Sequence, residues 1–168
     1  MRTRQHAVLS EDGRYRYRLS RTWASPGPPC AFIGANPSTA DATADDPTVR
    51  KMTALAKLWG CSALQVVNVA AYRATDPRHL AGVDDPIGPD NDAHLLAVAR
   101  DVHARGGPVV AAWGTVAPTA AAAHAARLLA GAGVPLLALR TTKHGHPGHP
   151  LYVRSNTIPT PWPPPSGP

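Results

Sequence analysis

The side chains best suited to chemistry lie in four short segments, at residues 34–41, 68–73, 113–115 and 142–152, and each follows an apolar stretch. Amide, hydroxyl, imidazole and aromatic groups of this kind bind and orient polar organic ligands, and imidazole also transfers protons. We take these segments as the source of a binding or catalytic site. The candidates in them are Asn36, Pro37, Ser38, Asn68, Tyr72, Arg73, Trp113, Lys143, His146, His149 and Tyr152.

A group of aspartates between residues 41 and 46 supplies candidate acids. Asp46 precedes Pro47, and proline suits the first turn of a helix, so we expect Asp46 to act as a helix cap. Asp45 has no such structural role in the sequence. We therefore prefer Asp45 as the functional acid.

Three histidines fall in the Gly/Pro-rich segment that ends the candidate list, at positions 144, 146 and 149. This spacing is not a standard zinc pattern, and a fourth ligand would have to come from the aspartate-rich segment. A metal site is the lesser alternative. We expect no metal and no organic cofactor.

The elements that must position these residues alternate between strand and helix. Apolar strands are predicted at residues 30–34, 64–69, 108–113 and 135–139, and helices at 47–59, about 91–105 and 115–130. This alternation favours a three-layer α/β sandwich around a central four-stranded parallel sheet. Residues 7–9 and 15–19, around an Asp-Gly turn, predict an additional N-terminal β-hairpin. Ligands of such sheets bind at the carboxyl ends of the strands, where the candidate segments begin.

Length and composition fit one domain. The 168 residues are 43% hydrophobic, and we predict a domain over residues 1–158 with a disordered, proline-rich tail at 159–168. Two cysteines exclude a disulfide framework. No apolar leader and no run of 18 apolar residues is present, which predicts a cytoplasmic protein that does not enter a membrane.

The net charge of +6 is unevenly distributed. Residues 1–21 carry six arginines against two acids, residues 22–101 carry six bases against nine aspartates, and residues 102–168 carry five bases and no acid. Two basic ends therefore flank an acidic middle. Basic surfaces of this kind favour phosphate-bearing partners such as nucleic acid.

Seven ordered sequence blocks resemble an uncharacterised bacterial and phage family, domain of unknown function 1643, over about residues 6–155. The blocks are N-P-S-x-A at 36–40, D-D-P-T at 45–48, V-N at 67–68, R-A-T-D-P at 73–77, G-P-D-N-D at 88–92, A-W-G at 112–114 and H-P-L-Y at 149–152. The family name implies no activity.

A more distant resemblance does imply one. Residues 34–37, G-A-N-P, are similar to the first motif of the uracil-DNA glycosylase superfamily, whose mismatch-specific members read G-I-N-P. Residues 67–69 resemble its base-reading strand, and residues 110–114 resemble its L-W-G strand. His146-Pro147 or His149-Pro150 stands where the last motif begins. The resemblance implies a uracil-DNA-glycosylase-like fold.

The same resemblance implies roles for the candidates. Asn36 would hold the attacking water, Asn68 would read the base edge, and His149 or His146 would donate to the base oxygen. The superfamily's most active members carry aspartate where this chain has Asn36, so Asp41, Asp45 or Asp46 would have to supply a base. Residues expected to contact the remainder of the substrate are Arg73, Lys143 and Arg154 for phosphates and Tyr72, Trp113 or Tyr152 for stacking.

These arguments predict a hydrolase that breaks the N-glycosidic bond of a uracil-type or modified base in DNA. One alternative is a hydrolase of free nucleotides or nucleosides, which would turn over mononucleotides and bind DNA weakly. The other is a non-catalytic nucleic-acid binding module, whose salt-dependent DNA binding would not depend on Asn36.

Overall fold

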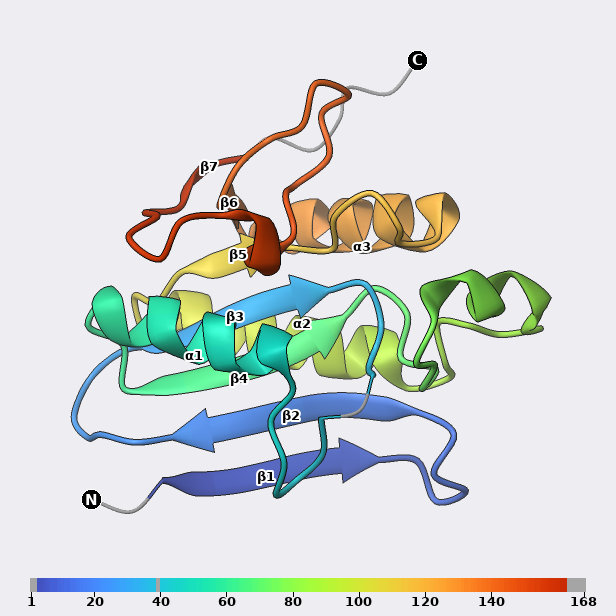
Figure 1. Cartoon of the computed structure of the whole chain (residues 1–168), viewed down its shortest axis with the longest axis horizontal. Helices are drawn as coiled ribbons and strands as arrows, with labels where there is room; N and C mark the ends of the chain where they lie inside the picture. Colours follow the sequence, from blue (N-terminus) through green and yellow to red (C-terminus); the bar gives the residue numbers. More distant parts are fainter. Residues whose placement is uncertain (1–2, 39, 163–168) are drawn as a thin grey trace.

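A sheet of seven strands runs through the middle of the molecule (Figure 1). The computed structural model describes residues 3–38 and 40–162. The strands lie in the order β1-β2-β4-β3-β5-β6-β7. Their bounds are β1 Arg4–Leu9, β2 Arg16–Thr22, β3 Pro29–Gly34, β4 Ala63–Asn68, β5 Val109–Ala111, β6 Leu137–Ala138 and β7 Thr160–Pro161. Strands and helices mix around this sheet, which confirms the predicted α/β class.

Four neighbouring strands in the centre, β4, β3, β5 and β6, are parallel. β1 pairs antiparallel with β2, β2 pairs antiparallel with β4, and β7 pairs antiparallel with β6. The predicted four-stranded sheet with a separate hairpin is therefore smaller than the observed sheet, which has seven strands. β2 continues the main sheet through its pairing with β4, a long-range contact that local sequence patterns do not reveal.

Helices cover both faces of the sheet. α1 (Pro47–Leu58) lies on one face, and α2 (Asn91–Ala104) and α3 (Thr119–Gly131) lie on the other (Figure 1). Two short 3₁₀ helices, η1 (Pro77–Gly82) and η2 (Pro150–Tyr152), interrupt the loops.

Successive side chains of the central strands point to opposite faces and build two cores. Ile33 and Ala111 pack with α2 and α3, whereas Phe32 and Val110 pack in the cluster that includes α1. This double burial explains why these strands read as continuous apolar runs. It also fixes the strand ends where the candidate segments begin.

The predicted disordered tail is wrong for its first residues. β7 pairs with β6, and Trp162 is only 5% exposed because its ring packs against Trp113 with ring centroids 5.3 Å apart. One buried tryptophan anchors a stretch whose proline content suggests an unpacked end. The rest of the predicted tail, residues 163–168, lies outside the described residues.

None of the helices in the described ranges is long and apolar enough to span a membrane.

Candidate functional site

A cleft of about 460 Å³ opens where β3, β4 and β5 end. The start of β2, the loop that leads into α1, the residues before η1 and the η2 segment complete its walls. Its chemically active lining comprises Arg16, Asn36, Ser38, Asp46, Asn68, His149 and Tyr152. Five of these seven, Asn36, Ser38, Asn68, His149 and Tyr152, are candidates from the sequence. The structure therefore brings together residues that are up to 116 positions apart.

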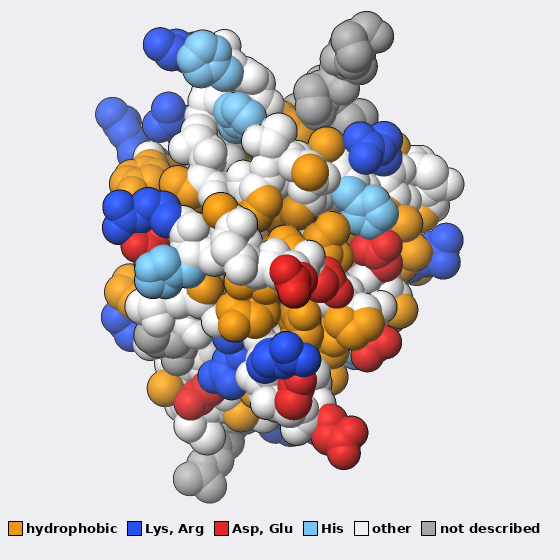
Figure 2. All heavy atoms as spheres, turned by 90° about the vertical axis from the view of Figure 1, so that its right-hand side faces the viewer, with side chains coloured by type: hydrophobic (Ala, Val, Ile, Leu, Met, Phe, Trp, Pro, Cys, Tyr) orange, Lys and Arg blue, Asp and Glu red, His pale blue; other side chains and the backbone are white. Residues whose placement is uncertain are grey.

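Figure 2 views the side of the molecule to which the arrows of β3, β4 and β5 point in Figure 1. Basic and histidine side chains occupy the upper part of this face, and acidic side chains lie beside further basic ones across its middle and lower parts. The upper part is built from the C-terminal third of the chain. This distribution matches the segment with five bases and no acid.

Asn68 lies at the end of β4 against the backbone of β3. Gly34 pairs in register with Asn68, and a Cβ at Gly34 would lie 2.7 Å from Asn68 Oδ1. Glycine is therefore required for the side chain of Asn68 to lie over β3. Asn68 is 4% exposed, and its Nδ2 has no partner among the described residues.

The amide of Asn36 is held in one orientation by its own loop. Its Nδ2 donates to the carbonyl oxygens of Pro37 (2.9 Å) and Ala74 (2.8 Å), which uses both of its hydrogens. No described residue donates to Oδ1. Asn36 therefore offers the cleft an acceptor and no donor. Pro37 itself is buried and acts through its backbone oxygen.

His149 has a defined tautomer. The backbone N–H of Leu151 donates to its Nδ1 (3.2 Å) at the start of η2, so the neutral ring carries its hydrogen on Nε2. Burial lowers the pKa of His149 below the usual 6.5, although the charge of Asp46 opposes this effect. Near neutral pH His149 is therefore an uncharged hydrogen-bond donor.

Tyr152 is the aromatic side chain of the cleft. Its ring centroid lies 5.7 Å from that of His149, and the residue is 77% exposed. An exposed ring beside a polar cleft is free to stack on an incoming ligand.

The acid in the cleft is Asp46, and the preference for Asp45 rests on a wrong premise. Asp46 caps α1 through Oδ1, which accepts from Val49 N, and its Oδ2 accepts from Ser38 Oγ (2.6 Å). Asp45 is outside the lining and forms an ion pair with the buried Arg21 (2.7 Å). Asp45 therefore has a structural role, as the partner of Arg21, that the sequence does not show. Asp46 both caps α1 and faces the cleft.

Arg16 is a cleft residue that the sequence analysis missed. Its side chain is buried, Nη1 donates to the Ala40 carbonyl oxygen, and Nε has no partner in the described part of the chain. Burial lowers the pKa of Arg16 to about 10, so it stays charged near pH 7. Asp46 is the main opposite charge acting on it.

A bulge in β2 turns Arg16 toward the cleft. Leu9 of β1 pairs with Arg16 and Val8 pairs with Arg18, so Tyr17 is an extra residue in β2. As a result Arg16 and Arg21 both face the loop before α1, whereas Arg18 bonds Gln65 on the other side. The alternation of Arg and Tyr suggests a regular strand with one cationic face. The bulge cannot be recognised from this alternation, so the sequence does not indicate that Arg16 faces the cleft.

Several other candidates lie elsewhere. Trp113 and His146 line a separate pocket near α3, which removes Trp113 as a stacking residue of the cleft and separates His146 from Asn36. Tyr72 packs edge-on against Tyr15, and Arg73 donates to the Gly13 carbonyl oxygen. Lys143 is exposed and does not line the cleft, and Arg154 is exposed in the segment after η2.

Within residues 3–38 and 40–162, no three His, Cys, Asp or Glu side chains are grouped as metal ligands. The cleft instead combines an acceptor at Asn36, an uncharged donor at His149, a carboxylate at Asp46 and a buried cation at Arg16. Such a set can orient a water molecule and stabilise charges of both signs on one ligand.

Comparison with known proteins identifies a family whose function is unknown. No curated protein matches this sequence. The model of a family described as "Protein of unknown function (DUF1643)" matches residues 16–151, a range that includes Arg16, Asn36, Asn68 and His149. Because the match spans most of the chain, the protein belongs to the DUF1643 family.

Proposed function

We propose that the protein hydrolyses the N-glycosidic bond of a uracil-type or modified base in DNA, with a uracil-DNA-glycosylase-like fold and a cytoplasmic location. The observation that carries this proposal is the pairing of Asn36 and His149 in one cleft. Asn36 presents only an acceptor and His149 only a donor, at strand ends whose motifs resemble those of the glycosylase superfamily in the same order.

In the proposed reaction Asn36 Oδ1 accepts a hydrogen bond from a water molecule and directs its oxygen toward C1′ of the sugar. The C1′–N bond breaks, its electron pair leaves with the base, and the water oxygen bonds to C1′. Ser38 Oγ donates to Asp46, so it accepts from the water and relays one proton to that carboxylate. The departing base takes a proton from solvent after it leaves, and Asp46 returns its proton to solvent.

His149 supports the departure of the base. Its Nε2–H donates to a base oxygen on which negative charge develops, and as a neutral donor it does so without first losing a proton. Two residues position the base: the amide of Asn68 bonds its edge, and the ring of Tyr152 stacks on its face.

Arg16 and Asp46 give the cleft one positive and one negative charge, which match the two opposite charges that form when the glycosidic bond breaks. Bond cleavage places positive charge on the sugar and negative charge on the base, and the cleft holds one cation and one carboxylate that form no direct ion pair with each other. Fixed charges at a buried site stabilise such a transition state more than the neutral ground state. We therefore assign Asp46 to the sugar and Arg16 to the base.

DNA is the preferred substrate because of the charge distribution. The cleft is large enough for a base and part of its sugar, so a nucleotide would have to leave the DNA stack to reach it. The basic upper part of the same face would bind phosphates of the surrounding strand. A free nucleotide requires no such extended surface.

A screen for released bases tests this function. The wild-type protein would be incubated with oligonucleotides that contain uracil or modified bases, with several genomic DNAs and with mononucleotides, and free bases would be identified by mass spectrometry. We expect a free base and an abasic site from at least one DNA. Release from mononucleotides alone would favour the free-nucleotide hydrolase, and salt-dependent DNA binding without release would favour the binding module.

A further inference from the structure

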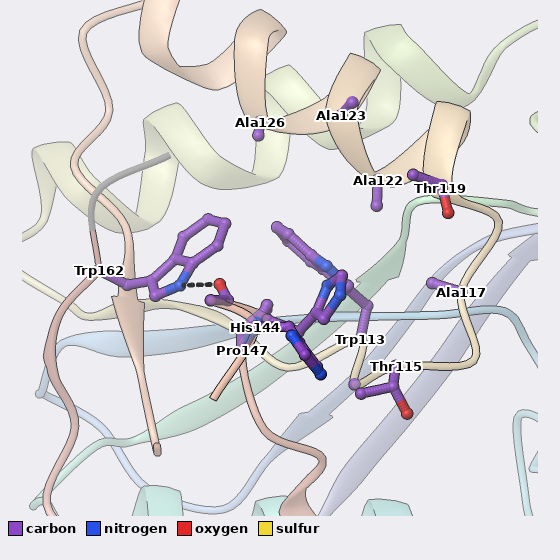
Figure 3. Close-up of a pocket in the computed structure, with 13 residues that line it drawn as sticks. Trp113, Thr115, Ala117, Thr119, Ala122, Ala123, Ala126, His144, Pro147 and Trp162 are labelled. Atoms are coloured by element: carbon purple, nitrogen blue, oxygen red, sulfur yellow. Dashed lines mark hydrogen bonds between the residues drawn. The ribbon is translucent and has the colours of Figure 1, made fainter. Parts of the chain in front are cut away.

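A second pocket, which we call the Trp113 pocket, lies outside the cleft between the end of β5, the start of α3 and residues 144–147 (Figure 3). Its volume is about 160 Å³, far more than one water molecule needs. Trp113 and Trp162 form one wall, and alanines of α3 form the opposite wall. The two indoles contact each other edge-to-face, so no aromatic ligand stacks between them.

The indole N–H of Trp113 has no hydrogen-bond partner among the described residues. Trp113 is 2% exposed, and its Nε1 bonds to no described residue although the ring lines the pocket. Trp162 differs, because its Nε1 donates to the Gly145 carbonyl oxygen (3.1 Å), the dashed line in Figure 3, and holds the loop in place. The N–H of Trp113 is therefore available to an acceptor that enters the pocket.

The start of α3 adds further donors. This helix has 13 residues, its N-cap is Pro118, and no side chain caps its first turn. The first backbone N–H groups of a helix have no partner within the helix, and its dipole places partial positive charge there. Thr119, at this end of the helix, lines the pocket.

The remaining polar side chains of the lining can also donate hydrogen bonds. His144, His146 and the hydroxyl of Thr115 complete it, and no Asp or Glu lines the pocket. Residues 102–168, which supply the whole lining, contain no acid at all. A pocket with many donors and no carboxylate favours an oxyanion with several acceptor oxygens.

The position of the pocket relates it to the cleft. Gly114 and Thr115 line both the Trp113 pocket and a neighbouring hollow, and His149 and Tyr152 line both that hollow and the cleft. The three spaces therefore follow one another along the same side of the molecule. A chain that places one nucleotide in the cleft can continue toward the Trp113 pocket.

We propose that the Trp113 pocket binds a phosphate group of the DNA strand whose base occupies the cleft. The identity of this strand as substrate rests on the proposed function. The phosphate accepts from Trp113 Nε1 and from the first turn of α3. It fixes the register of the strand while the cleft selects the base.

Two variants test the site by different physical effects. Trp113→Phe removes the indole N–H and keeps an aromatic ring against Trp162. Thr119→Glu places a carboxylate at the start of α3, which stabilises the helix but repels a phosphate. Trp23→Phe and Ala130→Glu are the controls. Trp23 Nε1 already bonds the Cys61 carbonyl oxygen, and Ala130 lies exposed near the opposite end of α3.

Affinity would be measured for inorganic phosphate by calorimetry and for a labelled single-stranded oligonucleotide by fluorescence anisotropy. Trp113→Phe should weaken both by about tenfold to a hundredfold, the effect of losing one hydrogen bond to a charged group. Thr119→Glu should abolish phosphate binding while its melting temperature stays at or above that of the wild type. Both controls should bind like the wild type.

Three results would overturn the proposal: no phosphate binding by the wild type, equal losses in the controls, or weakened phosphate binding with unchanged DNA binding. The last result would identify a site for free phosphate. Base release is not measured in either arm, so a failure of the proposed glycosylase activity would be recognised separately by the screen for released bases.

Discussion

Replacement of Arg16 by methionine should separate activity from stability. Arg16 is buried, yet the only hydrogen bond of its side chain to a described residue goes to the Ala40 carbonyl oxygen. Burial lowers its pKa to about 10, which corresponds to about 3 kcal/mol against the charged form. Loss of the single bond costs about 1–3 kcal/mol. The free energy of unfolding should therefore match that of the wild type or exceed it by up to about 2 kcal/mol.

Arg21 provides the matched control, because it is on the same strand and equally buried. Its guanidinium pairs with Asp45 and donates to the carbonyl oxygens of Ser20 and Asp41. Arg21→Met leaves the carboxylate of Asp45 and two carbonyl oxygens without their donor. The free energy of unfolding should fall by about 3 kcal/mol.

Urea unfolding of both variants, followed by circular dichroism, measures this contrast, and base release measures the functional effect. Arg16→Met should release base at least about a hundredfold more slowly than the wild type, the range found when one donor to a developing anion is removed. If Arg16→Met loses as much stability as Arg21→Met, or keeps full activity, Arg16 is a structural residue and its assignment to the departing base is wrong.

Three further predictions concern the remaining cleft residues. Asn36→Asp should melt at a lower temperature and release base no faster than the wild type, since its carboxylate oxygen would face the Pro37 and Ala74 carbonyl oxygens. A faster rate would contradict the two hydrogen bonds assigned to the Asn36 amide. The rate of base release should be flat above about pH 6.5 and fall as the pH falls through the lowered pKa of His149, because protonation of Nδ1 breaks its bond from the Leu151 N–H. The same protonation lowers the free energy of unfolding at acid pH. The rate of His149→Gln should not show this fall at acid pH. Tyr152→Ala should leave the melting temperature unchanged, since the residue is 77% exposed, and should weaken substrate binding by about 1–3 kcal/mol in anisotropy titrations.

The central strands and helices were predictable because their burial is recorded in local patterns. Buried parallel strands appear as short apolar runs, and Asp46 before Pro47 indicates the start of α1. The antiparallel additions were not predictable in the same way. β7 depends on one tryptophan within a proline-rich stretch, and the pairing of β2 with β4 joins segments more than forty residues apart.

Within the site, sequence placed the residues at strand ends but could not resolve choices that depend on loop geometry. His146 and His149 differ by three positions, yet a turn at Gly145 and the start of η2 direct them into different pockets. Asp46 was set aside as a cap, although a cap can also face a cleft. Arg16 was missed because a bulge changes the direction of side chains without changing the sequence pattern.

The rate of base release under single-turnover conditions, compared between the wild type, Asn36→Ala and His149→Ala, tests the central claim most directly. Both variants should keep the wild-type melting temperature within a few degrees, since each residue makes few bonds, and both should lose at least about a hundredfold in rate. Full activity in both variants would contradict the assignment of this cleft as the site of N-glycosidic bond hydrolysis.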